Sequence, residues 1–124
     1  METIKIAATE DTPGVILDPV NNVYEISGRS LPEDVVVFYQ PVMQWLEDLA
    51  KTPIKGMTLS FKLEYFNTAS SKLILDILLK LEEIHSGGNE IKVDWYHLAG
   101  DSDMKEAGEE YSEIVGLPFE IKQN

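Results

Sequence analysis

The chain contains no cysteine, which excludes a disulfide framework, a zinc site built on thiolates and a cysteine nucleophile. Basic residues are also few: 10 Lys and Arg stand against 22 Asp and Glu, which gives a formal net charge of −12. Binding to a nucleic-acid backbone or to an anionic membrane surface needs clusters of positive charge, so the composition argues against both partners. An acidic surface usually serves solubility, although it also suits a partner with a basic patch.

Long hydrophobic runs are missing as well. No apolar stretch approaches the length that spans a membrane, and residues 1–6 lack the basic region and apolar block of a signal peptide. We therefore expect a soluble cytoplasmic protein. With 124 residues, of which 44% are hydrophobic, and no low-complexity tract, the chain predicts a single domain over residues 1–124 with one core.

Catalytic and metal-binding motifs are also absent from the sequence. The two histidines, His85 and His97, have no obvious ligand cluster around them, and Gly87-Gly88 ends a predicted helix instead of opening one as a phosphate loop does. The acidic run over residues 101–110 fits no calcium-loop spacing and is typical of a solvated helix face. We expect no cofactor and no metal.

The first part of the chain predicts short strands. Alternation of apolar and polar residues predicts a strand over residues 3–7. The β-prone runs 15–17 and 23–26 are separated by turn formers and predict a β-hairpin, whose second strand we expect Gly28 to end.

A long helix is predicted over residues 33–51. Ser30 and Glu33 have the spacing of a capping box, with Pro32 near the first helical position. We expect a kink at Pro41, because proline removes a helical hydrogen bond. Apolar residues at helical spacing define the predicted inward face: Val35, Phe38, Val42, Trp45 and Leu49.

Strict alternation from Met57 to Tyr65 predicts the clearest strand, with one face toward a core and the other toward water. From Ser70 the period becomes helical, and the stop signal is Gly87-Gly88. The inward stripe of this second helix comprises Ile74, Ile77, Leu78, Leu81 and Ile84. Leu75 and Leu79 lie outside the stripe, and either a broad core face or a partner surface accounts for them.

The last part of the chain predicts a strand over 91–96, a helix over 101–115 capped by Gly116, and a short strand over 118–121. The inward residues expected of this third helix are Met104, Ala107, Tyr111, Ile114 and Val115. Strand–helix–strand segments favour parallel pairing, and the opening hairpin makes the sheet mixed. The fold class is thus α/β, a two-layer domain with a mixed sheet and about three helices, whose strand order stays open.

The junction over residues 65–72 carries the strongest functional signal, because a strand passes directly into a helix there through a hydroxyl-rich turn. Unpaired N–H groups and a partial positive charge at a helix start favour a phosphate group. An exposed Thr68 would be accessible to a kinase, and Lys72 is near enough to pair with the phosphate. The alternative is structural: Asn67 or Thr68 caps the helix, which is worth roughly 1 kcal/mol.

The sequence, including this junction, resembles the SiaC family of bacterial regulatory phosphoproteins. The resemblance covers about residues 12–121 and is carried by the runs YEISGRSLPED (24–34), FYQP (38–41), WL (45–46) and LEYFNTASSK (63–72). It implies a fold similar to STAS domains, the class of anti-sigma-factor antagonists. It also implies that Thr68, the threonine of the Asn-Thr-x-Ser segment, is the phosphoacceptor.

The resemblance further implies three partners. A kinase with a GHKL-like fold modifies the threonine and a PP2C-type phosphatase reverses the modification. The unphosphorylated form binds and activates a diguanylate cyclase, and so promotes biofilm formation. From the residues we expect Asn67, Ala69, Ser70 and Ser71 to shape the phosphosite, while candidate partner contacts are Phe66, Lys72, Leu75 and Leu79.

Two other hypotheses stay open. A small enzyme would use carboxylates and His97, and it would need a concave pocket with convergent polar groups and shifted pKa values. A structural domain would form homo-oligomers, a weak homodimer for instance, through sheet edges and the face with Leu75 and Leu79.

Overall fold

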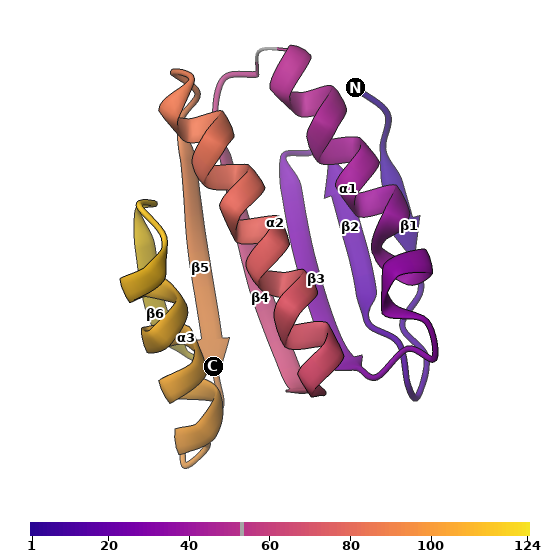
Figure 1. Ribbon diagram of the computed structural model, residues 1–124, viewed down its shortest axis with the longest axis vertical. Coiled ribbons are helices and arrows are strands. Elements are labelled where there is room, and N and C mark those ends of the chain that lie inside the picture. The colour runs from indigo at the N-terminus through magenta and orange to yellow at the C-terminus, as the bar shows by residue number, and fades with distance from the viewer. Residues whose placement is uncertain (53) are drawn as a thin grey trace.

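A computed structural model describes residues 1–52 and 54–124. Six strands form one sheet, and their order in space follows the chain (Figure 1). The elements are β1 (Ile4–Ile6), β2 (Gly14–Asp18), β3 (Val23–Ser30), α1 (Val35–Lys51), β4 (Met57–Phe66), α2 (Thr68–Ser86), β5 (Ile91–His97), α3 (Ser102–Ile114) and β6 (Phe119–Gln123). The first three strands pair antiparallel and the last four pair parallel, so the predicted mixed sheet is confirmed.

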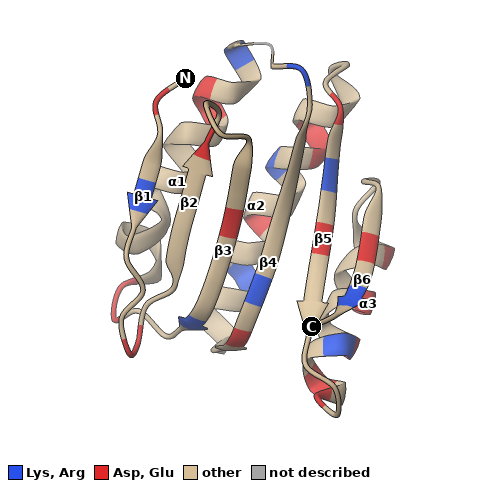
Figure 2. Cartoon of the chain, turned by 180° about the vertical axis from the view of Figure 1, so that it is seen from behind, with Lys and Arg blue, Asp and Glu red and all other residues tan. Residues whose placement is uncertain are grey.

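The helices cover one face of this sheet and leave the other bare, as Figures 1 and 2 show from opposite sides. The alternation in β4 follows from this arrangement: Leu59 and Phe61 are buried under the helices, whereas Thr58 on the bare face is exposed. Opposite charges pair between neighbouring strands of the bare face (Figure 2), for example Lys62 with Glu25 at 2.8 Å. The two-layer α/β prediction is confirmed.

Trp95, on β5, occupies the centre of the core. Its ring is fully buried, with the Phe61 ring centroid at 5.1 Å and that of Tyr111 at 5.4 Å. The indole Nε1 donates a hydrogen bond of 2.9 Å to the Met104 carbonyl oxygen. This bond satisfies the one polar atom of the side chain and ties α3 to the sheet.

The end of β3 differs from the prediction in two ways. Gly28 does not end the strand: pairing with β4 continues to Ser30, and the register shifts beside Gly28, whose φ of +93° suits glycine. The capping box at Ser30 is also wrong. Asp34 is the N-cap of α1, and its carboxylate accepts a hydrogen bond from the Val37 N–H at 3.1 Å.

The helical faces match the prediction with a few exceptions. In α1 the buried set adds Tyr39 and Leu46, while Phe38 is half-buried, and the helix is continuous through Pro41. In α3 Ile114 is 57% exposed instead of inward, because the buried stripe of the helix follows Met104, Gly108 and Tyr111 and leaves Ile114 outside it. The C-cap of α3 is Val115, and not Gly116 as predicted.

Candidate functional site

The strand-to-helix junction is built by Asn67. It follows the last residue of β4, and its side-chain oxygen accepts a hydrogen bond of 2.8 Å from the Ser70 N–H. Its carbonyl oxygen accepts another from the Ser71 N–H at 3.0 Å. Asn67 therefore caps α2, which begins at Thr68, so that of the two predicted cap candidates Asn67 has this role and Thr68 does not.

Thr68 is the accessible hydroxyl of this segment. Its side chain is exposed at the first helical position, and the structure gives its Oγ1 no hydrogen bond within residues 1–52 and 54–124. Ser70, in contrast, is 0% exposed. Ser71 is half-buried, and its Oγ donates to the Thr68 carbonyl oxygen at 2.7 Å. Ala69 is exposed but carries no hydroxyl, so Thr68 is the hydroxyl that another protein can reach directly.

Three buried hydroxyls lie directly beneath the first turn of α2. Ser70 Oγ donates to the Ser30 carbonyl oxygen at 2.9 Å, and Ser30 Oγ donates to Ser70 Oγ at 2.8 Å. The Tyr39 hydroxyl of α1 lies 2.7 Å from Ser30 Oγ. Burial raises the pKa of Tyr39, which keeps this hydroxyl protonated. Together these contacts join the end of β3, the first half of α1 and the start of α2.

On the other side, α3 contacts the same turn. The Tyr111 hydroxyl donates to the Ser71 carbonyl oxygen at 2.7 Å. Burial raises the pKa of Tyr111 to about 12, so this hydroxyl keeps its proton and remains a donor. The first turn of α2 is thus held from both α1 and α3.

Exposed apolar side chains surround this edge of the sheet. Because β3 and β4 are parallel neighbours, the helices that follow them start at the same edge (Figure 1). The first turn of α1 exposes Val36 and Val37, which are 65% and 62% accessible. Tyr65, near the end of β4, is also exposed, with the Arg29 guanidinium 5.5 Å from its ring centroid. None of these residues was predicted as a partner contact, although three consecutive valines at a helix start cannot all face inward.

The predicted partner residues divide into two groups. Phe66 is half-buried and stacks edge-on with Trp95 at 6.3 Å, so much of its surface belongs to the core. Leu75 also packs partly against the core, whereas Lys72 is exposed and Leu79 is 41% exposed. By helical spacing Lys72, Leu75 and Leu79 share one face of α2 with Thr68. A stripe of the predicted residues therefore continues from Thr68 along the helix.

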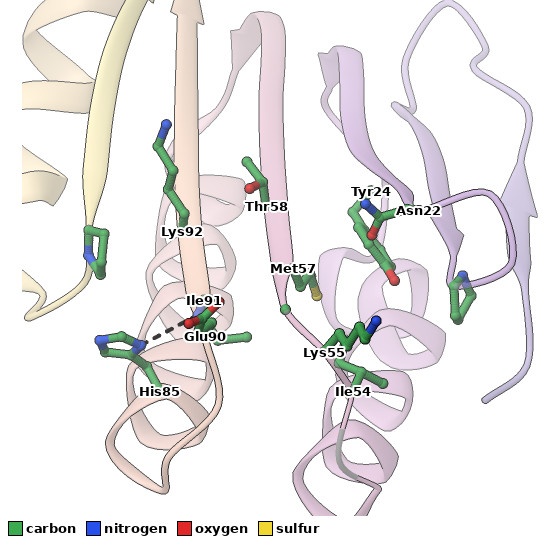
Figure 3. Close-up of a pocket in the computed structure, with 13 residues that line it drawn as sticks. Asn22, Tyr24, Ile54, Lys55, Met57, Thr58, His85, Glu90, Ile91 and Lys92 are labelled. Carbon is green, nitrogen blue, oxygen red and sulfur yellow. Dashed lines mark hydrogen bonds between the residues drawn. The ribbon is translucent and has the colours of Figure 1, made fainter.

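A cavity of about 690 Å³ opens at the opposite edge of the sheet (Figure 3), between the C-terminal end of α2 and the starts of β4 and β5. His85 on its wall is engaged with backbone: its Nδ1 lies 3.0 Å from the Asn89 carbonyl oxygen and 3.4 Å from the Ile91 N. His97 does not line this cavity. The cavity thus does not assemble the carboxylate and His97 centre that an enzyme hypothesis requires.

Residues 1–52 and 54–124 contain neither a candidate membrane-spanning helix nor a candidate metal centre. In the part of the chain outside position 53, no helix combines the length and apolarity that crossing a bilayer demands. Within the same described residues, no cluster of His, Asp and Glu has the geometry to hold a metal ion.

The fold and the site define a class: a small two-layer α/β domain that presents a hydroxyl at the start of a helix. Residues 6–124 match the model of the SiaC family, described as regulatory phosphoproteins. The chain therefore belongs to the SiaC family.

Similar proteins come from Pseudomonas aeruginosa. An uncharacterised protein of strain UCBPP-PA14 is 30% identical over 122 residues, which cover 98% of this chain and 97% of that protein. The structure of SiaC is 30% identical and superposes with a TM-score of 0.91 over 100% of both chains. A crystal structure of the diguanylate cyclase SiaD in complex with its activator SiaC also matches, with 30% identity and a TM-score of 0.91 over 98% of this chain and 99% of that one.

Proposed function

We propose that this protein is a non-enzymatic partner-switching regulator with Thr68 as its phosphoacceptor. In its unphosphorylated form it binds and activates a diguanylate cyclase. A GHKL-like kinase phosphorylates Thr68 and thereby blocks binding, and a PP2C-type phosphatase restores it. The observation that carries the proposal is the position of Thr68, whose hydroxyl is exposed while Asn67 caps the helix and Ser70 is buried.

The chemistry of the site suits a phosphate. A phosphothreonine adds a charge of about −1.5 to −2 and three strong acceptor oxygens. The positive end of the α2 dipole faces this group, and exposed Lys72 lies one turn further along the helix. The phosphate is thus tolerated by the protein itself, so the switch does not require unfolding.

The phosphate disfavours binding of the effector, the diguanylate cyclase. Exposed Val36, Val37 and Tyr65 lie at the same edge of the sheet as Thr68, and a partner that covers them must also remove water from this edge. Burying a doubly charged group without a matching cation is costly. The bare hydroxyl carries a far smaller desolvation cost. We place the cyclase contact on this edge and on the α2 stripe of Lys72, Leu75 and Leu79.

The proposal is tested with charge and isostere variants of Thr68. Thr68→Ala and Thr68→Val keep the surface neutral, Thr68→Glu adds a charge, and Thr58→Glu is a matched control on the bare face of the sheet. The diguanylate cyclase recovered with tagged Thr68→Ala protein from host cells is then titrated with each variant by calorimetry. We expect Thr68→Glu to weaken binding about tenfold or more, and the other three to stay within about twofold of wild type.

Two results would contradict the proposal. Equal affinity of Thr68→Ala and Thr68→Glu for the cyclase would show that charge at this position is not read. Peptide mass spectrometry on protein from the host, with the Thr68 peptide well covered, would count against phosphorylation if no phosphate appeared under any growth condition.

A further inference from the structure

The buried hydroxyls of Ser30, Tyr39 and Ser70 form a chain with one direction. Ser70 Oγ donates a hydrogen bond to the Ser30 carbonyl oxygen, and Ser30 Oγ donates a hydrogen bond to Ser70 Oγ. Because a hydroxyl has a single proton, Tyr39 must be the donor across the 2.7 Å contact with Ser30 Oγ. The order of donation is therefore Tyr39 to Ser30 to Ser70 and back to the Ser30 backbone. We call this chain the hydroxyl relay.

Stability alone does not explain the relay. All three residues are 0% exposed, so each hydroxyl has lost its water and needs a partner inside the protein. Apolar groups of the same shape would fill this space at little or no cost in stability. The hydroxyls instead fix the direction in which each side chain points, because a hydrogen bond holds its donor and acceptor within a narrow range of distance and angle.

The direction matters because of where Ser70 stands on α2. Ser70 follows Thr68 by two positions, which turns their side chains about 200° apart around the helix. A Ser70 side chain held inward therefore holds the Thr68 side chain outward. The Ser30 carbonyl oxygen also accepts the Asn67 N–H at 3.1 Å, so the cap and the first turn share one anchor. The Tyr111 contact with the Ser71 carbonyl oxygen anchors the same turn from α3.

We propose that Ser30, Tyr39 and Ser70 are positioning residues for the modification of Thr68. The relay keeps the first turn of α2 formed and fixes its rotation, so the kinase meets Thr68 on a preformed helical turn rather than on a loose segment. This inference rests on the proposed function and adds to it that the kinase recognises the folded turn. The relay residues act through Thr68 and are themselves too buried to touch the kinase.

The test separates positioning from stability by comparing three full-length variants. Ser70→Ala breaks the relay and leaves Ser30 with an incomplete set of partners. The triple variant Ser30→Ala, Tyr39→Phe, Ser70→Ala removes all three hydroxyls and leaves none of them unpaired, so its stability is expected to lie nearer to wild type than that of Ser70→Ala. Ile84→Val, at the far end of α2, is the control for a mild loss of stability.

Each variant is incubated with ATP and a soluble extract of host cells, and the initial rate of phosphate incorporation at Thr68 is measured by peptide mass spectrometry. Hydrogen exchange of the Ser70 and Ser71 amides is measured by NMR on the same proteins. We expect the rate of phosphorylation to fall about three- to tenfold in both relay variants, because the rate scales with the fraction of time that the turn is formed. We also expect the Ser70 and Ser71 amides of these variants to exchange faster. Ile84→Val is expected to match wild type in both measurements.

The outcomes are distinguishable. Wild-type phosphorylation at Thr68 with equal rates in the relay variants would overturn the positioning role and leave the proposed function intact. A rate that recovers together with stability in the triple variant would also overturn it, because only a structural role would follow stability. Absence of phosphate on wild-type Thr68 would overturn the proposed function, and the positioning role would fall with it.

Discussion

Replacing Gly108 by alanine probes the contact on which the position of α3 depends. An added Cβ would lie 2.3 Å from Trp95 Cδ1 and 2.7 Å from both Cγ and Nε1. Ordinary van der Waals contacts begin at 3.4 Å, so the helix and the ring must separate by about 1 Å. The ring has no free space to enter, because Trp95 is 0% exposed and its Nε1 is bound to the Met104 carbonyl oxygen.

Two opposing effects set the magnitude. Alanine is the better helix former by about 1 kcal/mol, which favours the variant. Overpacking a dense core usually costs 1–3 kcal/mol, and a rigid, hydrogen-bonded indole places Gly108→Ala at or beyond the upper end of that range. We expect the free energy of unfolding to fall by about 2 kcal/mol. Movement of α3 is also expected to lengthen the Tyr111 contact with Ser71, one turn further along.

Urea denaturation followed by far-UV circular dichroism measures this loss. Glu109→Ala, exposed on the same helix, is the control and is expected to stay within about 0.5 kcal/mol of wild type. In a double-mutant cycle, Gly108→Ala should cost less in a Trp95→Phe background than in the wild type, because the smaller ring leaves room for the methyl group. If Gly108→Ala were as stable as wild type, the close approach of α3 to Trp95 would be refuted.

Three further changes have expected outcomes. Asn67→Ala removes the cap on the Ser70 N–H and should lower the free energy of unfolding by about 1 kcal/mol in urea titrations. Asn67→Asp should retain most of the stability that the cap provides, because aspartate also caps helices. The hydrogen bond from the Asn21 side chain lowers the pKa of Asp18. The stabilising contribution of the Asp18 carboxylate is therefore present above the usual carboxylate pKa and is lost as the pH falls through the lowered value. Asp18→Asn should flatten the pH dependence of stability in that acidic range, and an unchanged slope would refute the role of Asp18. Burial raises the pKa of Tyr111 to about 12, so absorbance titration at alkaline pH should lose its latest tyrosine component in Tyr111→Phe, with circular dichroism reporting whether the fold persists.

The sequence predicts those features that depend on local periodicity. Alternation from Met57 to Tyr65 correctly identified β4 and its buried face, and the helical stripe correctly identified the inward side of α2. The placement of Thr68 at a strand-to-helix junction was likewise predictable, because both periods meet there. The strand order was not, since handedness and connection length permit several arrangements of parallel strands.

Ser30 shows why the remaining features could not be predicted. Its spacing from Glu33 matches a helix cap, yet its hydrogen-bond partners are the hydroxyls of Tyr39 and Ser70, and Ser70 is distant in sequence. No local pattern records a contact formed by folding. The same holds for Ile114, whose apolar character predicts burial but which lies outside the buried stripe of Met104, Gly108 and Tyr111 on α3.

Helix α2 separates the two ends of the molecule. It begins with Thr68 at one edge of the sheet and carries His85 to the cavity at the other, a span of about 26 Å at 1.5 Å per residue. This distance is about three Debye lengths at physiological ionic strength, so charge at one end is screened from the other. A label or a surface tether attached beside the cavity would therefore leave the Thr68 edge electrostatically and sterically undisturbed. The domain can be immobilised by one end while its binding partners are counted at the other.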